Sequence, residues 1–249
     1  MKLQLIRNAT MKIEYTEFTF LTDPVLCNKH AFESFAGKSK NPVVALPVPA
    51  EEVVAGLDAV IISHLHMDHF DQTAEQLLPK SLPFFCQPQD QQRLMDKGFQ
   101  NTFPVDHSLS WNGIEITRTP GRHGQGKWAE DLAPVSGFVL RAKDEPIVYW
   151  IGDSVLTQDV EDVIRICQPD IILTHSSGAM LEDSGPIVMD AKQTISVCKH
   201  VPKATVVAVH MDALDPGTVS RNDLYQHALI ELGPSGNLII PNDGEILSF

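Results

Sequence analysis

The segment between Ser63 and Asp71 carries a high density of side chains that can bind a metal. It reads Ser-His-Leu-His-Met-Asp-His-Phe-Asp, so three imidazoles and two carboxylates fall within nine residues. Buried polar and charged groups are costly unless they are hydrogen-bonded or bound to a cation. This density predicts a divalent-metal site, and a solvated histidine-rich turn is the alternative.

The residues before this segment predict the element that would hold it. Residues 58–63 form a short run rich in β-branched side chains, typical of a buried strand, and loops at strand ends commonly carry functional groups. In an extended chain His64 and His66 lie on one side and can share one metal. Asp68 and His69 follow at a turn and can face a second metal.

The motif His-x-His-x-Asp-His after a strand resembles the signature of the metallo-β-lactamase-fold superfamily of metallohydrolases. The resemblance implies an α/β (α+β) fold, a four-layer αβ/βα sandwich, with residues 1–249 as one hydrolase domain. It also implies further metal ligands later in the chain.

Three later residues match these expected ligands. His123, in a turn flanked by glycines, would complete the first metal site, Asp153 would bridge both metals, and His210 would bind the second. Each has a local alternative. His123 could be a surface hairpin histidine, Asp153 could cap the helix expected near Thr157, and His210 could be a satisfied core histidine.

The N-terminus predicts a meander that ends in a further candidate. Residues 2–6, 11–15 and 17–21 alternate in polarity as three short antiparallel strands would. The segment Leu-Thr-Asp-Pro that follows resembles the branch related to ascorbate-6-phosphate lactonase. Asp23 in that segment would orient a ligand histidine or simply form an Asp-Pro turn.

Several other residues are candidates for contacts around the site. His175 follows a predicted strand and could hydrogen-bond substrate or a ligand, or merely end the strand. Arg122, Lys127 and Arg221 could meet an anionic substrate group. Residues 36–49 and 124–134 lack periodicity and are candidate lids.

The rest of the chain alternates between strand and helix patterns. Strands are expected at 83–86, 114–117, 136–142, 147–151, 171–174 and 204–209, and helices at 89–97, 157–167, 190–199 and 221–232. Ser220 and Asp223 fit a capping box before the last helix. Residues 237–240 and 245–247 are expected to close the chain as a hairpin.

Composition excludes several classes of protein. The chain has 19 basic and 32 acidic residues and a net charge of −13, which disfavours nucleic acid as a partner. The four cysteines are widely spaced, no signal-peptide pattern is present, and no apolar run approaches the roughly 20 residues of a membrane span. These features predict a cytoplasmic protein with free thiols that acts on a small molecule.

The expected chemistry follows from the resemblance. Two metals about 3.5 to 4 Å apart, bridged by Asp153 and a hydroxide, would use that hydroxide to attack a lactone, ester or phosphoester, as a lactonase, esterase or phosphodiesterase does. Asp68 would also act as a catalytic proton carrier. The histidine-rich ligands favour two Zn²⁺ ions, with Mn²⁺ or Fe²⁺ as alternatives. A non-catalytic metal-binding or sensory protein on the same fold is the competing interpretation.

Overall fold

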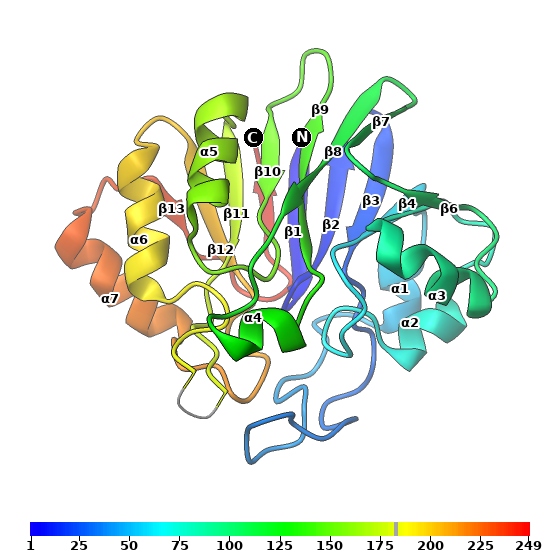
Figure 1. The fold of residues 1–249 in the computed structure, drawn as a ribbon, viewed down its shortest axis with the longest axis horizontal. Coiled ribbons are helices and arrows are strands. Elements are labelled where there is room, and N and C mark those ends of the chain that lie inside the picture. The colour runs from blue at the N-terminus through cyan, green and yellow to red at the C-terminus, as the bar shows by residue number, and fades with distance from the viewer. Residues whose placement is uncertain (182–183) are drawn as a thin grey trace.

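A computed structural model of the protein describes residues 1–181 and 184–249. Two seven-stranded sheets pack face to face, and helices cover the outer side of each sheet (Figure 1). The predicted four-layer αβ/βα sandwich of the α/β class is therefore confirmed.

The first sheet has the strand order β14-β1-β2-β3-β4-β5-β6. Its strands are β1 (Lys2–Arg7), β2 (Thr10–Tyr15), β3 (Phe18–Thr22), β4 (Ala59–Ile62), β5 (Phe84–Cys86), β6 (Thr102–Pro104) and β14 (Ile246–Ser248). The predicted N-terminal meander pairs antiparallel, whereas β3 to β6 pair parallel.

The second sheet repeats this plan, with the order β13-β12-β11-β10-β9-β8-β7. Its strands are β7 (Ser108–Trp111), β8 (Ile114–Pro120), β9 (Ser136–Arg141), β10 (Val148–Trp150), β11 (Ile171–His175), β12 (Thr205–Val209) and β13 (Leu238–Ile239). Strands β7 to β10 pair antiparallel, and β10 to β13 pair parallel.

The helices are α1 (Ala50–Val54), α2 (Gln72–Leu77), α3 (Gln91–Asp96), α4 (Lys127–Asp131), α5 (Gln158–Cys167), α6 (Ala191–His200) and α7 (Arg221–Glu231), with a 3₁₀ turn at Pro88–Asp90. Helices α1 to α3 lie on one side of the sheets and α5 to α7 on the other, with α4 between the two groups at the lower edge of the view (Figure 1). Helix α7 begins with the predicted capping box of Ser220 and Asp223. Among the described residues, no helix has the length and apolar character needed to cross a membrane.

The largest apolar core lies between the two sheets and draws side chains such as Leu5, Phe20, Phe138 and Leu173 from both. Strand β4 contributes side chains to two apolar cores, one on each face of its sheet. Ala59 and Ile61 face this central core, whereas the alternate side chains of the same strand face the core under α1, α2 and α3. A strand that is buried on both faces is apolar throughout, which explains the unbroken apolar run before the histidine motif.

The prediction for the C-terminus is wrong. Residues 237–240 and 245–247 do not form a hairpin, because β13 pairs parallel with β12 in one sheet and β14 pairs antiparallel with β1 in the other. The backbone at Gly244 and Glu245 hydrogen-bonds to Leu5 instead. Each apolar segment completes the edge of an existing sheet, which satisfies more backbone groups than an isolated two-stranded hairpin would.

The segment 124–134 is also more regular than predicted, because α4 lies within it. The expected free cysteines are found: Cys27, Cys86 and Cys198 are buried thiols, and Cys167 is partly buried.

Candidate metal centre

The site lies where strands of both sheets end at the same edge. Asp23 follows β3 and His64 comes two residues after the end of β4, in the first sheet. Asp153 and His210 follow β10 and β12, in the second sheet. Because parallel neighbours end together, residues far apart in the chain become neighbours at this edge.

The motif loop is held by a turn and by two anchors. The carbonyl oxygen of His66 accepts hydrogen bonds from the backbone N–H groups of His69 (3.0 Å) and Phe70 (2.9 Å). The Phe70 ring packs into the core under α2 and α3. Asp71, the last acidic residue of the motif, caps α2 by accepting from the N–H of Ala74, so it serves the fold and does not face the cluster.

Two groups of candidate ligands result. His64, His66 and His123 form one group, here called the three-histidine cluster, with ligand atoms within 4.8 Å of one another. The other, here called the carboxylate cluster, is composed of Asp68, His69, Asp153 and His210. In that cluster Asp68 Oδ2 lies 3.5 Å from His69 Nε2 and 3.6 Å from His210 Nε2.

Asp153, a member of the carboxylate cluster, also faces the three-histidine cluster. Its Oδ2 is 3.1 Å from His69 Nε2 and 3.4 Å from His123 Nε2, so one oxygen atom faces both groups. The carboxylate can approach this closely because the preceding residue is Gly152. Its φ is +73°, and a Cβ there would lie 2.6 Å from the carbonyl oxygen of Ser136. The glycine is therefore required by the backbone path to Asp153.

Hydrogen bonds behind the rings aim their free nitrogens at the centre. His123 Nδ1 donates to the carbonyl oxygen of Ile187 (2.9 Å), and His69 Nδ1 donates to Asp23 Oδ2 (2.6 Å). Nδ1 is therefore occupied on each ring, and Nε2 is the nitrogen left to bind an ion. His210 adopts a φ of +63°, uncommon for this residue type, and its buried Nε2 has no hydrogen-bond partner.

These observations test whether a cation fits. His64 Nε2 and His66 Nδ1 lie 2.9 Å apart, and two lone pairs this close need a proton or a metal ion between them. The buried Nε2 of His210 has no hydrogen-bond partner, and a bound metal ion would satisfy it. Neutral imidazoles and carboxylates are also the ligands that zinc and similar divalent ions take. The donor set therefore fits divalent metal.

Electrostatics differ across the centre. Burial lowers the pKa of His64 well below its ordinary value and that of His66 to about 4, so both rings are neutral at pH 7. Burial also opposes charge on His69, but Asp153, Asp68 and Asp23 outweigh it and hold the pKa of His69 well above the ordinary value. Burial alone would raise the pKa of Asp68 and Asp153; neighbouring histidines reverse this and keep both values low.

The other predicted site residues have definite places. Asp23 is fully buried and accepts from Ser63 as well as from His69, so the structure places it behind the His69 ring. His175 is buried and its Nδ1 lies 2.5 Å from Asp153 Oδ1. The Arg122 side chain is exposed and does not line the pocket, and only its backbone contacts Ser154 and Val155.

Two neighbours of the site were not predicted from the sequence. The Asn8 side chain donates to the carbonyl oxygen of Asp68 (3.0 Å), and the Asn8 carbonyl accepts from the N–H of His210 (3.0 Å). Trp150 donates to His175 (2.9 Å). Asn8 follows a strand in a tight turn with a φ of +59°, so the sequence gives a turn signal there and no indication of a site.

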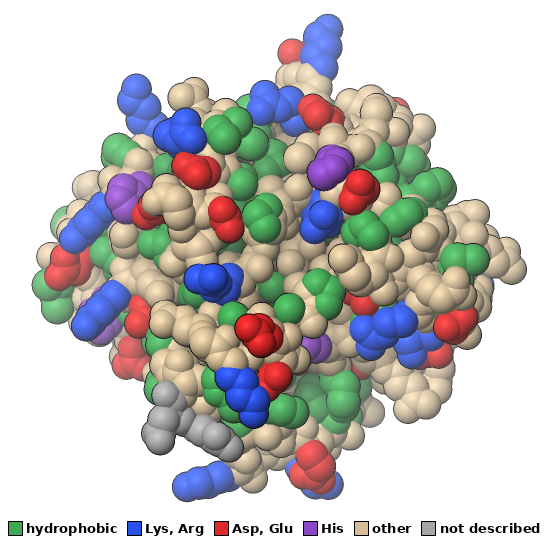
Figure 2. Space-filling view, in the orientation of Figure 1, with side chains coloured by type: hydrophobic (Ala, Val, Ile, Leu, Met, Phe, Trp, Pro, Cys, Tyr) green, Lys and Arg blue, Asp and Glu red, His purple; other side chains and the backbone are tan. Residues whose placement is uncertain are grey.

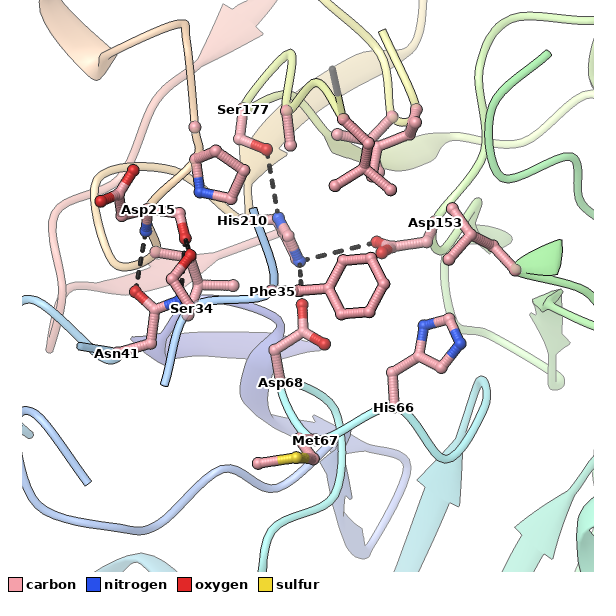
Figure 3. Close-up of a pocket in the computed structure, with 18 of the residues that line it drawn as sticks. Ser34, Phe35, Asn41, His66, Met67, Asp68, Asp153, Ser177, His210 and Asp215 are labelled. Atoms are coloured by element: carbon pink, nitrogen blue, oxygen red, sulfur yellow. Dashed lines mark hydrogen bonds and ion pairs between the residues drawn. The ribbon is translucent and has the colours of Figure 1, made fainter. Parts of the chain in front are cut away.

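A pocket of about 560 Å³ opens above the clusters (Figure 3). His66, Asp68, His123, Asp153 and His210 contribute to its floor. Most of the other lining side chains are apolar: Phe32, Phe35, Leu65, Met67, Leu132, Ala179, Leu181, Ile187, Val188 and Leu214. Among the described residues that line the pocket, none is Lys or Arg.

One wall of the pocket is the segment 32–41, here called the strap. Asp215 lies beside the strap and holds it by accepting from the N–H groups of Lys38 and Ser39 (2.7 Å each). Figure 3 shows the Phe35 ring of the strap projecting across the pocket. That side chain is 78% exposed, which is unusual for an unpartnered phenylalanine and marks the mouth as apolar.

The fold and the site together define a class of protein. The β-lactamase superfamily domain matches residues 19–211. The chain therefore belongs to the metallo-β-lactamase superfamily, as its histidine motif predicts.

Particular relatives match along the whole length. The chain is 34% identical to UPF0173 protein YddR of Bacillus subtilis (strain 168), with both chains fully covered. A structure described as "a possible metal-dependent hydrolase from Veillonella parvula DSM 2008" is 32% identical, with a TM-score of 0.96, covering 100% of this chain and 99% of that one. The isothiocyanate hydrolase from Delia radicum gut bacteria is 33% identical, with a TM-score of 0.94 and the same coverage.

Proposed function

We propose that this metal-dependent hydrolase of the metallo-β-lactamase superfamily holds two divalent ions and cleaves a small, uncharged electrophile. The three-histidine cluster would hold one ion, and His69, His210 and Asp68 the other. Asp153 would bridge them, and Zn²⁺ is the expected metal. The observation that carries the proposal is the position of Asp153 Oδ2, 3.1 Å from His69 Nε2 in one cluster and 3.4 Å from His123 Nε2 in the other.

Two ions at these clusters would supply an activated water as the nucleophile and would polarise the bond to be cleaved. The chain supplies the remaining functions. Asp68 is the one carboxylate of the carboxylate cluster with substantial exposure, its side chain being 28% exposed at the pocket floor. Its Oδ2 can take a proton from the water and deliver it to the leaving group.

The lining of the pocket favours an uncharged substrate over a phosphoester. The anion-binding residues expected from the sequence do not reach it: Lys127 is exposed elsewhere, and Arg221 pairs with Asp212 and Asp243. Glu33 and Asp215 line the rim instead, so an anion would meet repulsion there. This apolar pocket suits a lactone, an ester or an isothiocyanate better than it suits a phosphoester. Isothiocyanate is the substrate for which the enzyme from Delia radicum gut bacteria is named.

The test is a panel assay on protein loaded with zinc. The panel contains an aryl ester, a γ-lactone, an aryl-alkyl isothiocyanate and an aryl phosphodiester, each with and without a chelator. We expect chelator-sensitive hydrolysis of at least one uncharged compound and slower or absent turnover of the phosphodiester. Preferred cleavage of the phosphodiester would contradict the substrate assignment. Two bound ions without turnover of any compound would favour a non-catalytic metal-binding protein.

A further inference from the structure

His175 has a hydrogen-bond partner on each of its ring nitrogens. Trp150 Nε1 lies 2.9 Å from His175 Nε2, and His175 Nδ1 lies 2.5 Å from Asp153 Oδ1. All three side chains are at most 3% exposed. An indole nitrogen can only donate, so His175 Nε2 must accept and cannot carry a proton. The proton of the neutral ring is then on Nδ1 and is donated to Asp153.

This arrangement separates His175 from the ligand histidines. Its ring lies within ligand distance of His69, Asp153 and His210, and by proximity alone it would count as a fourth metal-binding group. Yet its Nε2 lone pair accepts a hydrogen bond from the Trp150 indole, and its Nδ1 carries the proton that is donated to Asp153. By contrast, His210 has an Nε2 without a partner. His175 therefore has no lone pair to offer a cation.

The three residues form one locally built unit. Trp150 ends β10 three residues before Asp153, and His175 ends the parallel neighbour β11, whose Leu173 is paired with Trp150. The two strands therefore bring the indole, the imidazole and the carboxylate together without a long loop. Because β10 and β11 lie inside the sheet, the unit is as rigid as the core around it.

We propose that His175 is a positioning residue that holds Asp153 Oδ1 by a hydrogen bond, so that Asp153 Oδ2 faces both ligand clusters. Trp150 fixes His175 as the tautomer that is protonated on Nδ1. The ring thereby sets the orientation of the bridging carboxylate. Because both of its nitrogens are used in hydrogen bonds, it does not bind a metal ion itself. The effect on turnover rests on the hydrolase function proposed above, whereas the tautomer and the metal affinity can be measured without it.

The tautomer is tested directly by two-bond ¹H–¹⁵N correlation of protein labelled with ¹⁵N-histidine, in the metal-free and zinc-loaded forms. Loss of a signal set in His175→Asn assigns the ring. We expect a protonated Nδ1 and an unprotonated Nε2 in both forms, with little change in either shift when zinc is added. A protonated Nε2, or a zinc-induced shift typical of a metal-bound nitrogen, would overturn the proposal.

The positioning role is tested by pairs of variants in a zinc titration. His175→Asn keeps a donor at the place of Nδ1, whereas His175→Leu removes it. Loss of a residue that orients a ligand typically weakens metal binding about 10- to 100-fold. We expect that loss for one ion in His175→Leu, with kcat reduced and KM unchanged, and near wild-type affinity in His175→Asn. Equal affinities in the two variants would refute the role.

Trp150→Phe tests the second half of the unit. We expect its His175 signals to show mixed tautomers and its weaker ion to be bound less tightly. Trp111→Phe is the matched control, because Trp111 packs against the same central core, on the rings of Phe18, Phe20 and Phe85. Should Trp150→Phe fail to fold, the comparison of the two His175 variants still decides the proposal. A single unchanged tautomer in folded Trp150→Phe would contradict it.

Discussion

The two clusters of candidate metal ligands are neighbours but differ in their charge. In the three-histidine cluster the rings are backed by neutral groups: Ser63 Oγ lies 2.9 Å from His64 Nδ1, and a backbone carbonyl accepts from His123. In the carboxylate cluster Asp23 lies directly behind His69, and Asp68 and Asp153 face it from the front. The second cluster thus already contains the negative charge that a cation needs.

This difference in charge indicates that the two clusters depend on each other. A divalent ion held only by three neutral histidines in a buried place keeps its full charge uncompensated, which is costly in a low-dielectric site. Asp153 offers the compensation that the three-histidine cluster lacks, because its Oδ2 faces His123 as well as His69. We therefore infer that occupancy of the two clusters depends on this one carboxylate.

The largest effect is expected from Asp153→Asn. Removing the shared charge should reduce bound metal from about two ions to one or fewer per chain. Turnover of the best substrate should fall by more than the roughly 100-fold that loss of a residue behind a ligand can cause. Inductively coupled plasma mass spectrometry and the panel assay measure the two quantities. Asp106→Asn, at a side chain 78% exposed, is the control. Two retained ions in Asp153→Asn would contradict the inference that both clusters depend on this carboxylate, because the clusters would then bind metal independently.

A smaller and more selective effect is expected behind the rings. Asp23→Asn removes the charge at His69 and should weaken the ion of the carboxylate cluster about 10- to 100-fold. Ser63→Ala removes a hydroxyl that contacts both His64 and Asp23, so we expect it to weaken both ions. Zinc titration with a competing chelator resolves the two binding steps. If Asp23→Asn weakened only the ion of the three-histidine cluster, the assignment of one ion to each cluster would be wrong.

The pH dependence of the stability of the metal-free protein tests whether burial keeps His175 neutral. Burial lowers the pKa of His175 from 6.5 to about 4, so between these values the unfolded chain binds a proton that the folded chain does not. Stability from this group is therefore present above pH 6.5 and is lost as the pH falls toward 4.

Urea unfolding at pH 7 and pH 5 measures this effect. Over that interval wild type should lose on the order of 2 kcal/mol more than His175→Asn, since each unit below 6.5 is worth about 1.4 kcal/mol. His64 and His66 titrate in both proteins and cancel in the difference. An equal loss in the two proteins would show that His175 is not held neutral.

The smallest effect is expected at the pocket mouth, away from both clusters. Phe35→Ala removes an apolar surface from the strap and should raise KM for an aryl substrate about five-fold, equivalent to about 1 kcal/mol of apolar contact, with kcat unchanged. Phe249→Ala, at an exposed ring of the C-terminus, is the matched control. A fall in kcat with unchanged KM would place Phe35 in the chemistry and not in substrate binding.

The sequence predicted most of the elements because their patterns are local. The unbroken apolar run of β4, the capping box before α7 and the alternation of the N-terminal meander all depend on neighbours within a few residues. The C-terminal prediction failed because pairing of β13 and β14 is decided by sheet edges more than 30 residues away in the chain. Turn chemistry at residues 242–244 could not distinguish a hairpin from a crossing between sheets.

The candidate site divides in the same way. By itself the sequence determined the donor types and their order, because a His-x-His spacing and a glycine before Asp153 constrain the backbone locally. Only the tertiary structure decided which ring nitrogens are used by hydrogen bonds and which are left for a metal, since that depends on Ile187, Asp23 and Trp150, contributed by distant segments. It also decided that the pocket is apolar, because its walls come from loops that meet only when the two sheets pack together.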